Sequence, residues 1–441
     1  MSVGESAIGL GRSGADVLDE LKRLPGGPEL LDVARVRDDI FLVGGAVRDI
    51  LLGAKPRELD VVVAGDAQAL ARDLARRLDT LAGQDPDERF ESTFHERFRT
   101  ALLRWVTEHE ERRIDIATRR AESYPRPGAL PKVREGTVEE DLDRRDFTVN
   151  AIAVSLGGPR RGKLVPAQQA LEDLASRRLR VLHDDSFIDD PTRLLRLGRY
   201  RARLQFEIEP HTAELAREAL DRDALASVSR ARIGAELRLA LGEPDPVASL
   251  SSLQQLGVLA ALSAGLALDT NLAATALELL PPEGHPQALL MAGLIVPSTQ
   301  PASRQTGASL RALLDEFEFP ASERERVVRS VLAAPSLIEM LELPQRPSQL
   351  HDALVAHPPE AVALAAALAG RATPGWEAAR EWLQRLRNIS LSIGGQDLLD
   401  AGIPAGPEIG RRLAAALAAK LDGEIEEGRE AELAAALAER A

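Results

Sequence analysis

The sequence contains no cysteine, so the chain can form neither a disulfide bond nor a thiolate metal site. Aromatic residues make up only 3% of it, whereas alanine and leucine are abundant, a composition typical of a mainly helical protein with one smaller mixed region. No apolar run reaches the length of a membrane span, and the N-terminal residues lack the pattern of a signal peptide. These absences favour a cytoplasmic enzyme without a membrane partner.

The chain also has fewer basic residues (55 Lys and Arg) than acidic residues (69 Asp and Glu). The formal net charge is −14, which argues against indiscriminate binding of nucleic acid because phosphate contacts need local positive charge. The charge is unevenly distributed, however, and eight arginines stand against four aspartates between Arg177 and Arg203. A basic stripe within an acidic protein predicts a structured RNA held at chosen places. The length of 441 residues suffices for about two to four modules.

The most informative stretch is an apolar run that ends at Gly44 and Gly45 and restarts as a helix carrying Arg48. This order brings backbone N–H groups and one guanidinium toward a polyphosphate. The next apolar run carries Glu58 and Asp60 on one face of a strand, because strand side chains alternate with period two. Each feature alone is commonly structural, but oxygen ligands beside a phosphate cradle together indicate Mg²⁺.

In this order the stretch resembles the signature of class II tRNA nucleotidyltransferases and bacterial poly(A) polymerases, a branch of the polymerase β-like nucleotidyltransferases. The family's strand reads Asp-x-Asp, and Glu58 replaces the first Asp, which keeps the charge but lengthens the arm by one methylene. The resemblance implies an α+β fold, in which a head with a small mixed sheet and helices precedes an all-α neck, body and tail. Glu58 and Asp60 would be metal ligands. Asp115 is either a third catalytic acid or the polar side of a half-buried strand.

The segment Arg144–Asn150 reads Arg-Arg-Asp-Phe-Thr-Val-Asn. Taken alone, mixed charge before an apolar run is typical of a salt-bridged helix start. The segment also matches the family's Arg-Arg-Asp-x-x-x-Asn motif in full. By that resemblance Arg145 contacts the incoming nucleotide, while Asp146 and Asn150 shape the ribose side of the pocket. The residues expected to hold the triphosphate are Gly44, Gly45, Arg48 and Arg145.

The segment Asp189–Arg193 reads Asp-Asp-Pro-Thr-Arg. Asp190 before a proline is typical of a helix cap and needs no ligand. The segment also resembles the family's Glu-Asp-x-x-Arg motif, in which the Asp and the Arg hydrogen-bond the Watson–Crick edge of the incoming base. A carboxylate accepts from the exocyclic amino group of C or A, and Arg donates to ring acceptors. Asp190 and Arg193 are therefore expected to act as an amino-acid template.

Arginines recur down the same predicted helix at spacings of three or four residues. Arg193, Arg196, Arg199 and Arg203 fall along one stripe. Four like charges on one helix face would repel one another, so the pattern predicts an anionic group against the stripe. Arg196 and Arg199 are expected to support the template or to contact phosphate.

Two later segments differ in how they compare with the family. Val165–Leu174 keeps a short helix but lacks the family's Asp-Pro and glycine-rich turn, and no functional residue is assigned there. Ile393–Gly410 alternates Gly-Pro turns with short helices, whose N-termini suit backbone phosphates. It resembles the tail of many bacterial class II enzymes, where tRNA is gripped far from the active site.

The expected organisation is a helical lead (1–35), a nucleotidyltransferase head (36–155), a base-reading and RNA-binding neck (156–241), a helical body (242–390) and a tRNA-binding tail (391–441). The resemblance implies a Mg²⁺-dependent enzyme that adds CCA to tRNA 3′ ends from CTP and ATP and releases pyrophosphate, without an obligatory protein partner. Alternatives are addition of only A or only CC, or poly(A) synthesis. The rival from another class is a non-catalytic RNA-binding protein whose metal site has lapsed at Glu58.

Overall fold

The computed structural model describes residues 11–82, 89–95, 100–106, 111–295 and 304–438. The chain divides into two compact units, Met1–Val228 and Ser229–Ala441. The finer division into five segments stays a prediction, and residues 1–10 of the predicted helical lead lie outside the described residues. None of the helices in the described ranges combines the length and the apolar character needed to cross a membrane.

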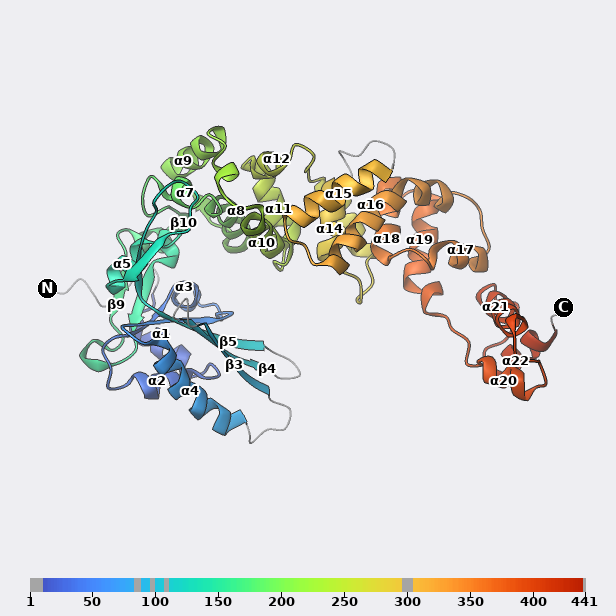
Figure 1. The fold of residues 1–441 in the computed structure, drawn as a ribbon, viewed down its shortest axis with the longest axis horizontal. Helices are drawn as coiled ribbons and strands as arrows, with labels where there is room; N and C mark the ends of the chain where they lie inside the picture. Colours follow the sequence, from blue (N-terminus) through green and yellow to red (C-terminus); the bar gives the residue numbers. More distant parts are fainter. Residues whose placement is uncertain (1–10, 83–88, 96–99, 107–110, 296–303, 439–441) are drawn as a thin grey trace. The chain divides into compact units, whose positions relative to one another are not determined.

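The first unit is built on a mixed sheet (Figure 1). Within the described residues this sheet has seven strands, in the order β3-β4-β5-β2-β1-β8-β9. The strands are β1 (Ile40–Val43), β2 (Leu59–Val63), β3 (Arg89–His95), β4 (Thr100–Val106), β5 (Glu111–Thr118), β8 (Ile152–Ser155) and β9 (Leu164–Pro166). Strands β2 and β5 are parallel, and the other neighbours are antiparallel. The expected α+β class with a mixed-sheet head is confirmed.

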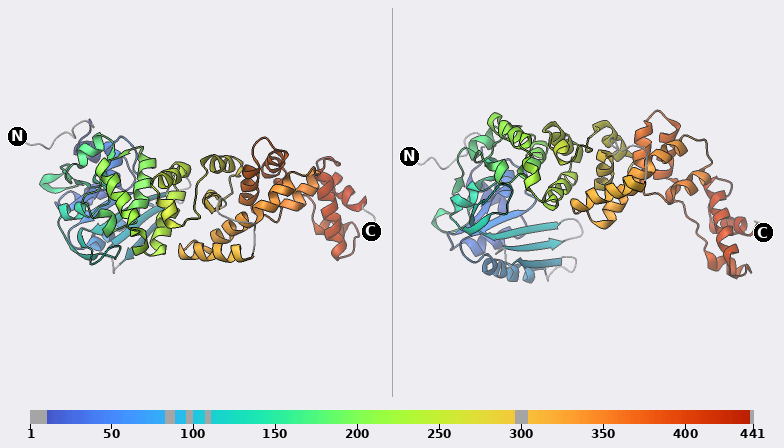
Figure 2. Two further views of the ribbon diagram at one scale, coloured as in Figure 1. Left: turned by 90° about the horizontal axis from the view of Figure 1, so that it is seen from above. Right: turned by 45° about the horizontal axis from the view of Figure 1, so that its top comes forward.

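Helices cover both faces of this sheet. Helix α4 packs against β3, β4 and β5, and Figure 2 shows it running along them. On another part of the sheet, Phe41, Val43 and Val62 form a buried cluster with Val138 and Leu142 of α5. The helices of this unit are α1 (Gly14–Leu21), α2 (Gly27–Ala34), α3 (Gly45–Leu51), α4 (Ala67–Ala82), α5 (Val138–Asp143), α6 (Ala170–Ala175), α7 (Ser186–Asp189), α8 (Arg193–Leu204) and α9 (Pro210–Asp221).

Short strand pairs and 3₁₀ turns complete the first unit. Strand β6 (Arg120–Ser123) pairs with β7 (Lys132–Glu135), and β10 (Arg178–Leu179) pairs with β11 (Glu207–Ile208). The 3₁₀ turn Thr148–Asn150 packs against both α3 and α6. Because this turn ends the Arg144–Asn150 motif, its packing places the end of the motif beside α3, the helix that follows β1.

The second unit is helical throughout its described residues. Helix α16, which contains Pro335, packs against α14, α18 and α19, while α20 to α22 enclose a separate small core of Ile393, Leu398, Ala416 and Ala436. The helices are α10 (Arg230–Leu241), α11 (Pro246–Gln255), α12 (Val258–Leu262), α13 (Thr270–Leu279), α14 (Pro286–Ile295), α15 (Arg304–Glu316), α16 (Ala321–Leu341), α17 (Pro347–Leu354), α18 (Pro359–Ala369), α19 (Pro374–Gln384), α20 (Gly395–Asp400), α21 (Pro407–Leu421) and α22 (Arg429–Ala438).

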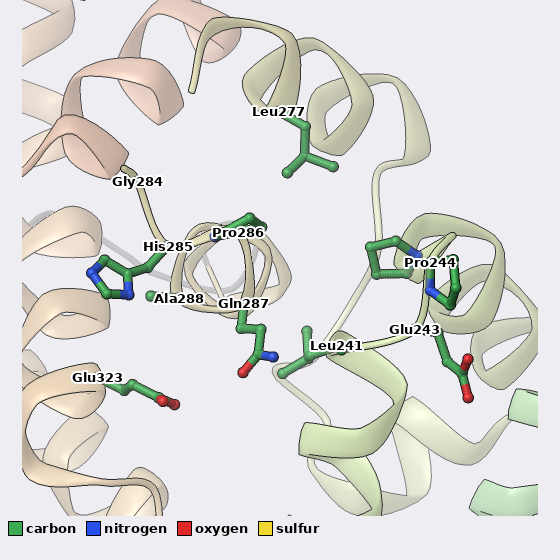
Figure 3. A pocket seen from close by; sticks show the side chains of 12 residues that line it. Leu241, Glu243, Pro244, Leu277, Gly284, His285, Pro286, Gln287, Ala288 and Glu323 are labelled. Atoms are coloured by element: carbon green, nitrogen blue, oxygen red, sulfur yellow. The ribbon is translucent and has the colours of Figure 1, made fainter. Parts of the chain in front are cut away.

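A cavity of about 600 Å³ lies among the helices of the second unit. Figure 3 shows the side chains of Glu243, Gln287 and Glu323 at its border, with His285 nearby. Among the described residues that line this cavity none is lysine or arginine, so its lining offers no cationic side chain to a phosphate. The cavity therefore contributes nothing to the nucleotide site predicted in the first unit.

Candidate active site

The turn between β1 and α3 requires glycine at its first position. Gly44 has φ +71° and ψ −136°, a conformation that other residues rarely adopt. A Cβ added to Gly44 would lie 2.6 Å from Nη1 of Arg145 and 3.5 Å from Oδ2 of Asp60. Helix α3 then starts at Gly45. The missing side chain therefore lets Arg145 lie directly against the turn, with Asp60 beside it.

The three predicted acids come together on one face of two parallel strands. Asp60 of β2 and Asp115 of β5 are direct partners in the strand register. Glu58 precedes β2 by one residue and therefore lies on the same side as Asp60. Asp115 alternates along β5 with Ile114 and Ile116, which are buried on the opposite face of the sheet, so Asp115 lies on the same face as Asp60.

Arg113 lies among these acids and was not predicted from the sequence as a site residue. Its Nη2 lies 3.0 Å from Oδ2 of Asp115, and its Nε lies 3.5 Å from Oε2 of Glu58. Arg113 precedes Asp115 by two residues on β5, so the period-two alternation puts both side chains on one face. That spacing was the available signal, but it does not say which strand lies alongside.

The charge of Asp60 is destabilised in this setting. Burial raises the pKa of Asp60 to about 6, and repulsion from Glu58 and Asp115 adds to the rise, although Arg145 opposes it. A cation beside Asp60 would relieve this cost, so the donor set fits a divalent ion. In the part of the chain that the structure describes, no group of three or more His, Cys, Asp or Glu side chains is arranged to hold a metal. Mg²⁺ commonly uses only one or two carboxylates together with substrate phosphates, which agrees with this arrangement.

Arg145 is held in position by a buried carboxylate. Asp141 is fully buried, and its Oδ2 lies 3.2 Å from Nη2 of Arg145. Its Oδ1 accepts from Nε and Nη2 of Arg144 at 3.0 and 2.8 Å. Burial alone would raise the pKa of Asp141, but the two arginines hold it below its usual range. The sequence signal for this role was the four-residue spacing between Asp141 and Arg145, which we did not use.

One continuous hydrogen-bonded network joins Arg48, Asn150, Asp146 and Arg196, and it is buried except at Arg196. Nε and Nη2 of Arg48 donate to Oδ1 of Asp49 at 2.8 and 2.7 Å, and its Nη1 donates to Oδ1 of Asn150. Nδ2 of Asn150 donates to Oδ1 of Asp146 at 2.9 Å. Oδ2 of Asp146 accepts from Nε and Nη2 of Arg196 at 2.8 and 2.6 Å. Arg48 is 1% exposed, so this network anchors it within the protein.

Tyr200 of α8 joins three of the predicted nucleotide-binding arginines. The guanidinium carbons of Arg48, Arg196 and Arg199 lie 5.6, 5.6 and 5.4 Å from the centre of its ring. The ring of Phe147 meets Tyr200 edge-on, with centroids 5.9 Å apart. Cations within about 6 Å of an aromatic ring face are attracted by its quadrupole. Sequence analysis missed Tyr200, although an aromatic residue amid arginines on one helix was a usable signal.

The predicted template residues stand at the start of α8. Oδ1 of Asp190 accepts from the backbone N–H and the hydroxyl of Thr192 at 3.1 and 2.6 Å, which closes the turn before the helix. Arg193 is 4% exposed and donates from Nη1 to Oγ of Ser186 at 2.5 Å. Its Nη2 donates to the carbonyl oxygen of Arg144 at 2.7 Å, which ties α8 to the Arg-Arg-Asp motif.

The arginine stripe of α8 faces carboxylates of the same chain. Arg196 pairs with Asp146 at 2.6 Å, and Arg203 lies 3.5 Å from Asp49. At least part of the anionic group predicted against the stripe is therefore supplied by the head. The segment 165–174, to which no function was assigned, carries α6 at its end.

A glycine turn, parallel strands bearing acids and an arginine-rich helix define a nucleotidyltransferase head of the polymerase β type. Residues 40–180 match the family described as Poly A polymerase head domain. Residues 205–267 match a second family, described as the probable RNA- and SrmB-binding site of polymerase A. Through these two segments the chain is similar to the class II tRNA nucleotidyltransferases and bacterial poly(A) polymerases.

Relatives named for three different activities resemble this chain. It is 44% identical over 232 residues to the A-adding tRNA nucleotidyltransferase of Halalkalibacterium halodurans, covering 52% of this chain and 51% of the relative. It is 41% identical over 210 residues to the CC-adding enzyme of Deinococcus radiodurans, covering 47% and 51%. The structure of the Thermotoga maritima CCA-adding enzyme complexed with tRNA is similar over 97% of this chain and 98% of that one, with a TM-score of 0.71 and 26% identity. The chain spans about half the length of the curated relatives it matches.

Proposed function

We propose that this chain extends the 3′ end of tRNA, adding CCA from CTP and ATP and releasing pyrophosphate. The observation that carries the proposal is the convergence of Asp60, Asp115 and Glu58 beside the Gly44 turn, against which Arg145 lies. Carboxylates next to a phosphate-binding turn are the arrangement that metal-assisted nucleotidyl transfer needs. The family supports transfer to RNA, and the similar tRNA-bound structure supports tRNA as the acceptor.

In this proposal the carboxylates of the site hold the metal ion, and its arginine binds and positions the triphosphate. Glu58 and Asp60, with Asp115 beside them, would supply the one or two carboxylates that hold Mg²⁺, which when bound activates the RNA 3′-hydroxyl and stabilises the departing pyrophosphate. Arg145, fixed by Asp141, binds the triphosphate against Gly44, where no side chain intervenes. The Arg48 network gives these groups a rigid support that needs no reorganisation during the reaction.

Choice of the nucleotide is assigned to the start of α8. Asp190 and Arg193 present a carboxylate and a guanidinium to the Watson–Crick edge of the base, and the bond from Arg193 to the carbonyl of Arg144 links this pair to the phosphate-binding motif. A buried polar pocket rejects a mismatched base because its own groups would be left unpaired. Arg193→Ala should blur the choice between CTP, ATP and UTP more than it lowers affinity for tRNA, and unchanged discrimination would remove the template role.

A second candidate is addition of the terminal A alone. It is favoured by the relative that is 44% identical over 232 residues, which is named as an A-adding enzyme. The acid cluster and the Arg-Arg-Asp motif would serve either activity, so the two candidate functions are distinguished by the nucleotides found in the reaction product. Poly(A) synthesis is less favoured, because a protein of net charge −14 suits one shaped RNA better than any RNA end.

The test uses three tRNA transcripts that end at the discriminator base, at C and at CC, each incubated with Mg²⁺ and labelled CTP or ATP. Extension of all three to CCA supports the full activity. Extension of only the CC-ended transcript by ATP supports the A-adding candidate. No extension, with tRNA binding retained, would support the RNA-binding protein with a lapsed site.

The matched control for this test is Asp60→Ala. It should abolish incorporation while leaving tRNA binding largely intact, because Asp60 lies in the head sheet among acids that would only repel phosphate. A loss of tRNA binding would show instead that Asp60 has a structural role.

A further inference from the structure

Four charged side chains form a square on one face of the head sheet. Asp60 and Asp115 are register partners across the parallel strands β2 and β5. Arg113 stands two residues before Asp115 on β5, and Glu58 directly precedes β2, so continuing the register by one residue from Leu59 and Ile114 sets Glu58 opposite Arg113. One corner of the square is therefore a cation, and three are carboxylates.

Arg113 contacts Asp115 and Glu58, two of the three acids. Its guanidinium lies 3.0 Å from Asp115 and 3.5 Å from Glu58. Arg145 lies toward Asp60, against the Gly44 turn. The side chains of Arg113, Glu58 and Asp115 are 42%, 46% and 34% exposed, so an ion arriving from solvent can reach all three.

Another arginine on the same face of the sheet, Arg104, provides a comparison for Arg113. Arg104 of β4 is the register partner of Arg113 on the far side from Glu58. Its guanidinium pairs with Glu91 of β3, the next strand outward, at 2.5 Å. Arg104 thus has the same charge as Arg113 and lies on the same face at the same level of the sheet, and Glu91, with which it forms an ion pair, lies outside the square.

We infer that Arg113 is the resident counter-cation of the acid cluster: it holds Glu58 and Asp115 in place when no divalent ion is bound, and it competes with that ion for them. The inference rests on the proposed function, because it takes the cluster to be a divalent-ion site. Arg113 acts through the acids and is a positioning residue. A guanidinium and a divalent ion repel each other, so the ion can take these oxygens only by displacing Arg113 from them.

The experiment measures Mn²⁺ affinity of the full chain, without nucleotide or tRNA, by electron paramagnetic resonance of the free ion. Arg113→Gln should bind Mn²⁺ about tenfold more tightly than the wild type, the size expected for removing a unit charge several ångströms from a divalent ion in a water-like medium. Arg104→Gln should stay within about twofold, because its charge is farther away and offset by Glu91. Asp60→Asn should weaken binding.

Thermal unfolding supplies a second readout and guards against a misfolded variant. In EDTA, Arg113→Gln should lower the midpoint of unfolding, and added Mn²⁺ should raise it by more than it does for the wild type. Arg113→Lys keeps the charge and should stay near wild-type Mn²⁺ affinity, so it provides a folded variant if the Gln variant does not fold.

The outcomes separate this inference from the proposed function. If Asp60→Asn weakens Mn²⁺ binding but Arg113→Gln does not strengthen it, Arg113 is no competitor and the inference is overturned while the ion site stands. If Asp60→Asn leaves Mn²⁺ binding unchanged, the ion site itself is misassigned, and the inference falls with it. If Arg104→Gln binds Mn²⁺ as much more tightly as Arg113→Gln does, the gain in affinity reflects the general surface charge, and this result would also overturn the inference.

Discussion

Replacing Asp146 by Asn tests whether the nucleotide site rests on a buried ion pair. Asp146 is 7% exposed and accepts four hydrogen bonds: two from Arg196, one from Nδ2 of Asn150 and one from the backbone N–H of Phe147. The Asn variant keeps the shape but loses the charge. If the new amide NH₂ faces Arg196, two donors oppose each other; if it faces Asn150 and Phe147, the same conflict arises there.

The expected cost is about 3 kcal/mol in the free energy of unfolding of the first unit. Breaking a buried pair by neutralising one partner costs about 3–5 kcal/mol, and the lower end applies because Arg196 is 31% exposed. For a unit of this size that shifts the unfolding midpoint by roughly 6–12 °C. In a double-mutant cycle with Arg196→Gln, the two losses should be non-additive by about 1–3 kcal/mol.

Calorimetry of the full chain, with hydrogen exchange of peptides from residues 144–150 and α8, measures this cost. The control is Asp184→Asn, which removes the same charge from a side chain that is 77% exposed and should cost no more than about 0.5 kcal/mol. The pKa of Asp146 lies below its usual range, chiefly because Arg196 and Asn150 outweigh the effect of burial. Its stabilisation is therefore present above about pH 4 and lost as the pH falls, so the gap between variant and wild type should shrink in acid. A loss no larger than that of Asp184→Asn would refute the reasoning.

Three further changes probe the site and the tail. Tyr200→Leu should raise the KM for ATP by about tenfold, because three arginines each lose roughly 0.5–1 kcal/mol of attraction to the ring. Tyr200→Phe keeps the ring and should restore the wild-type KM. Equal effects of the two substitutions would refute the ring's role. Gly44→Ala should lower kcat/KM for incorporation by about 100-fold, because the methyl group displaces Arg145, and activity near wild type would contradict the close approach. Bonds from Lys420 and Ser392 lower the pKa of Glu432 to about 2 against the opposing effect of burial. The protection of α20 to α22 against hydrogen exchange, relative to the intrinsic rate at each pH, should thus fall as the pH falls below about 4.5, and Glu432→Gln should already be less protected at pH 7 and lose that pH dependence.

Much of the head could be predicted because its signals are local. The glycine turn, the helix carrying Arg48 and the acid-bearing strand follow one another in the sequence, and each depends on backbone preference or periodicity within a few residues. Asp190 ahead of a proline was expected to cap a helix; in the structure Asp190 follows α7, its side chain accepts from Thr192, and α8 starts only at Arg193. The family resemblance supplied the expected roles, which no local rule contains.

The residues that sequence reasoning missed are those whose partners are remote in the chain. Tyr200 meets Arg48 and Phe147, which lie on other elements of the first unit. Asp49, to which the sequence analysis gave no role, accepts from Arg48 and lies close to Arg203 of α8. Side-chain type and spacing indicate which face of an element a residue occupies, but not which element covers that face.

The sequence by itself determined the glycine turn and the face on which each acid lies, because period-two and helical spacing are properties of a single segment, and its motifs indicated the class of fold through the family resemblance. Only the tertiary structure decided that Arg113 stands opposite Glu58 and beside Asp115. That pairing depends on the register between β2 and β5, whose partners, such as Leu59 and Ile114, lie 55 positions apart in the sequence. Strand register is set by packing of the whole sheet against its helices, and packing is a property that no single segment carries.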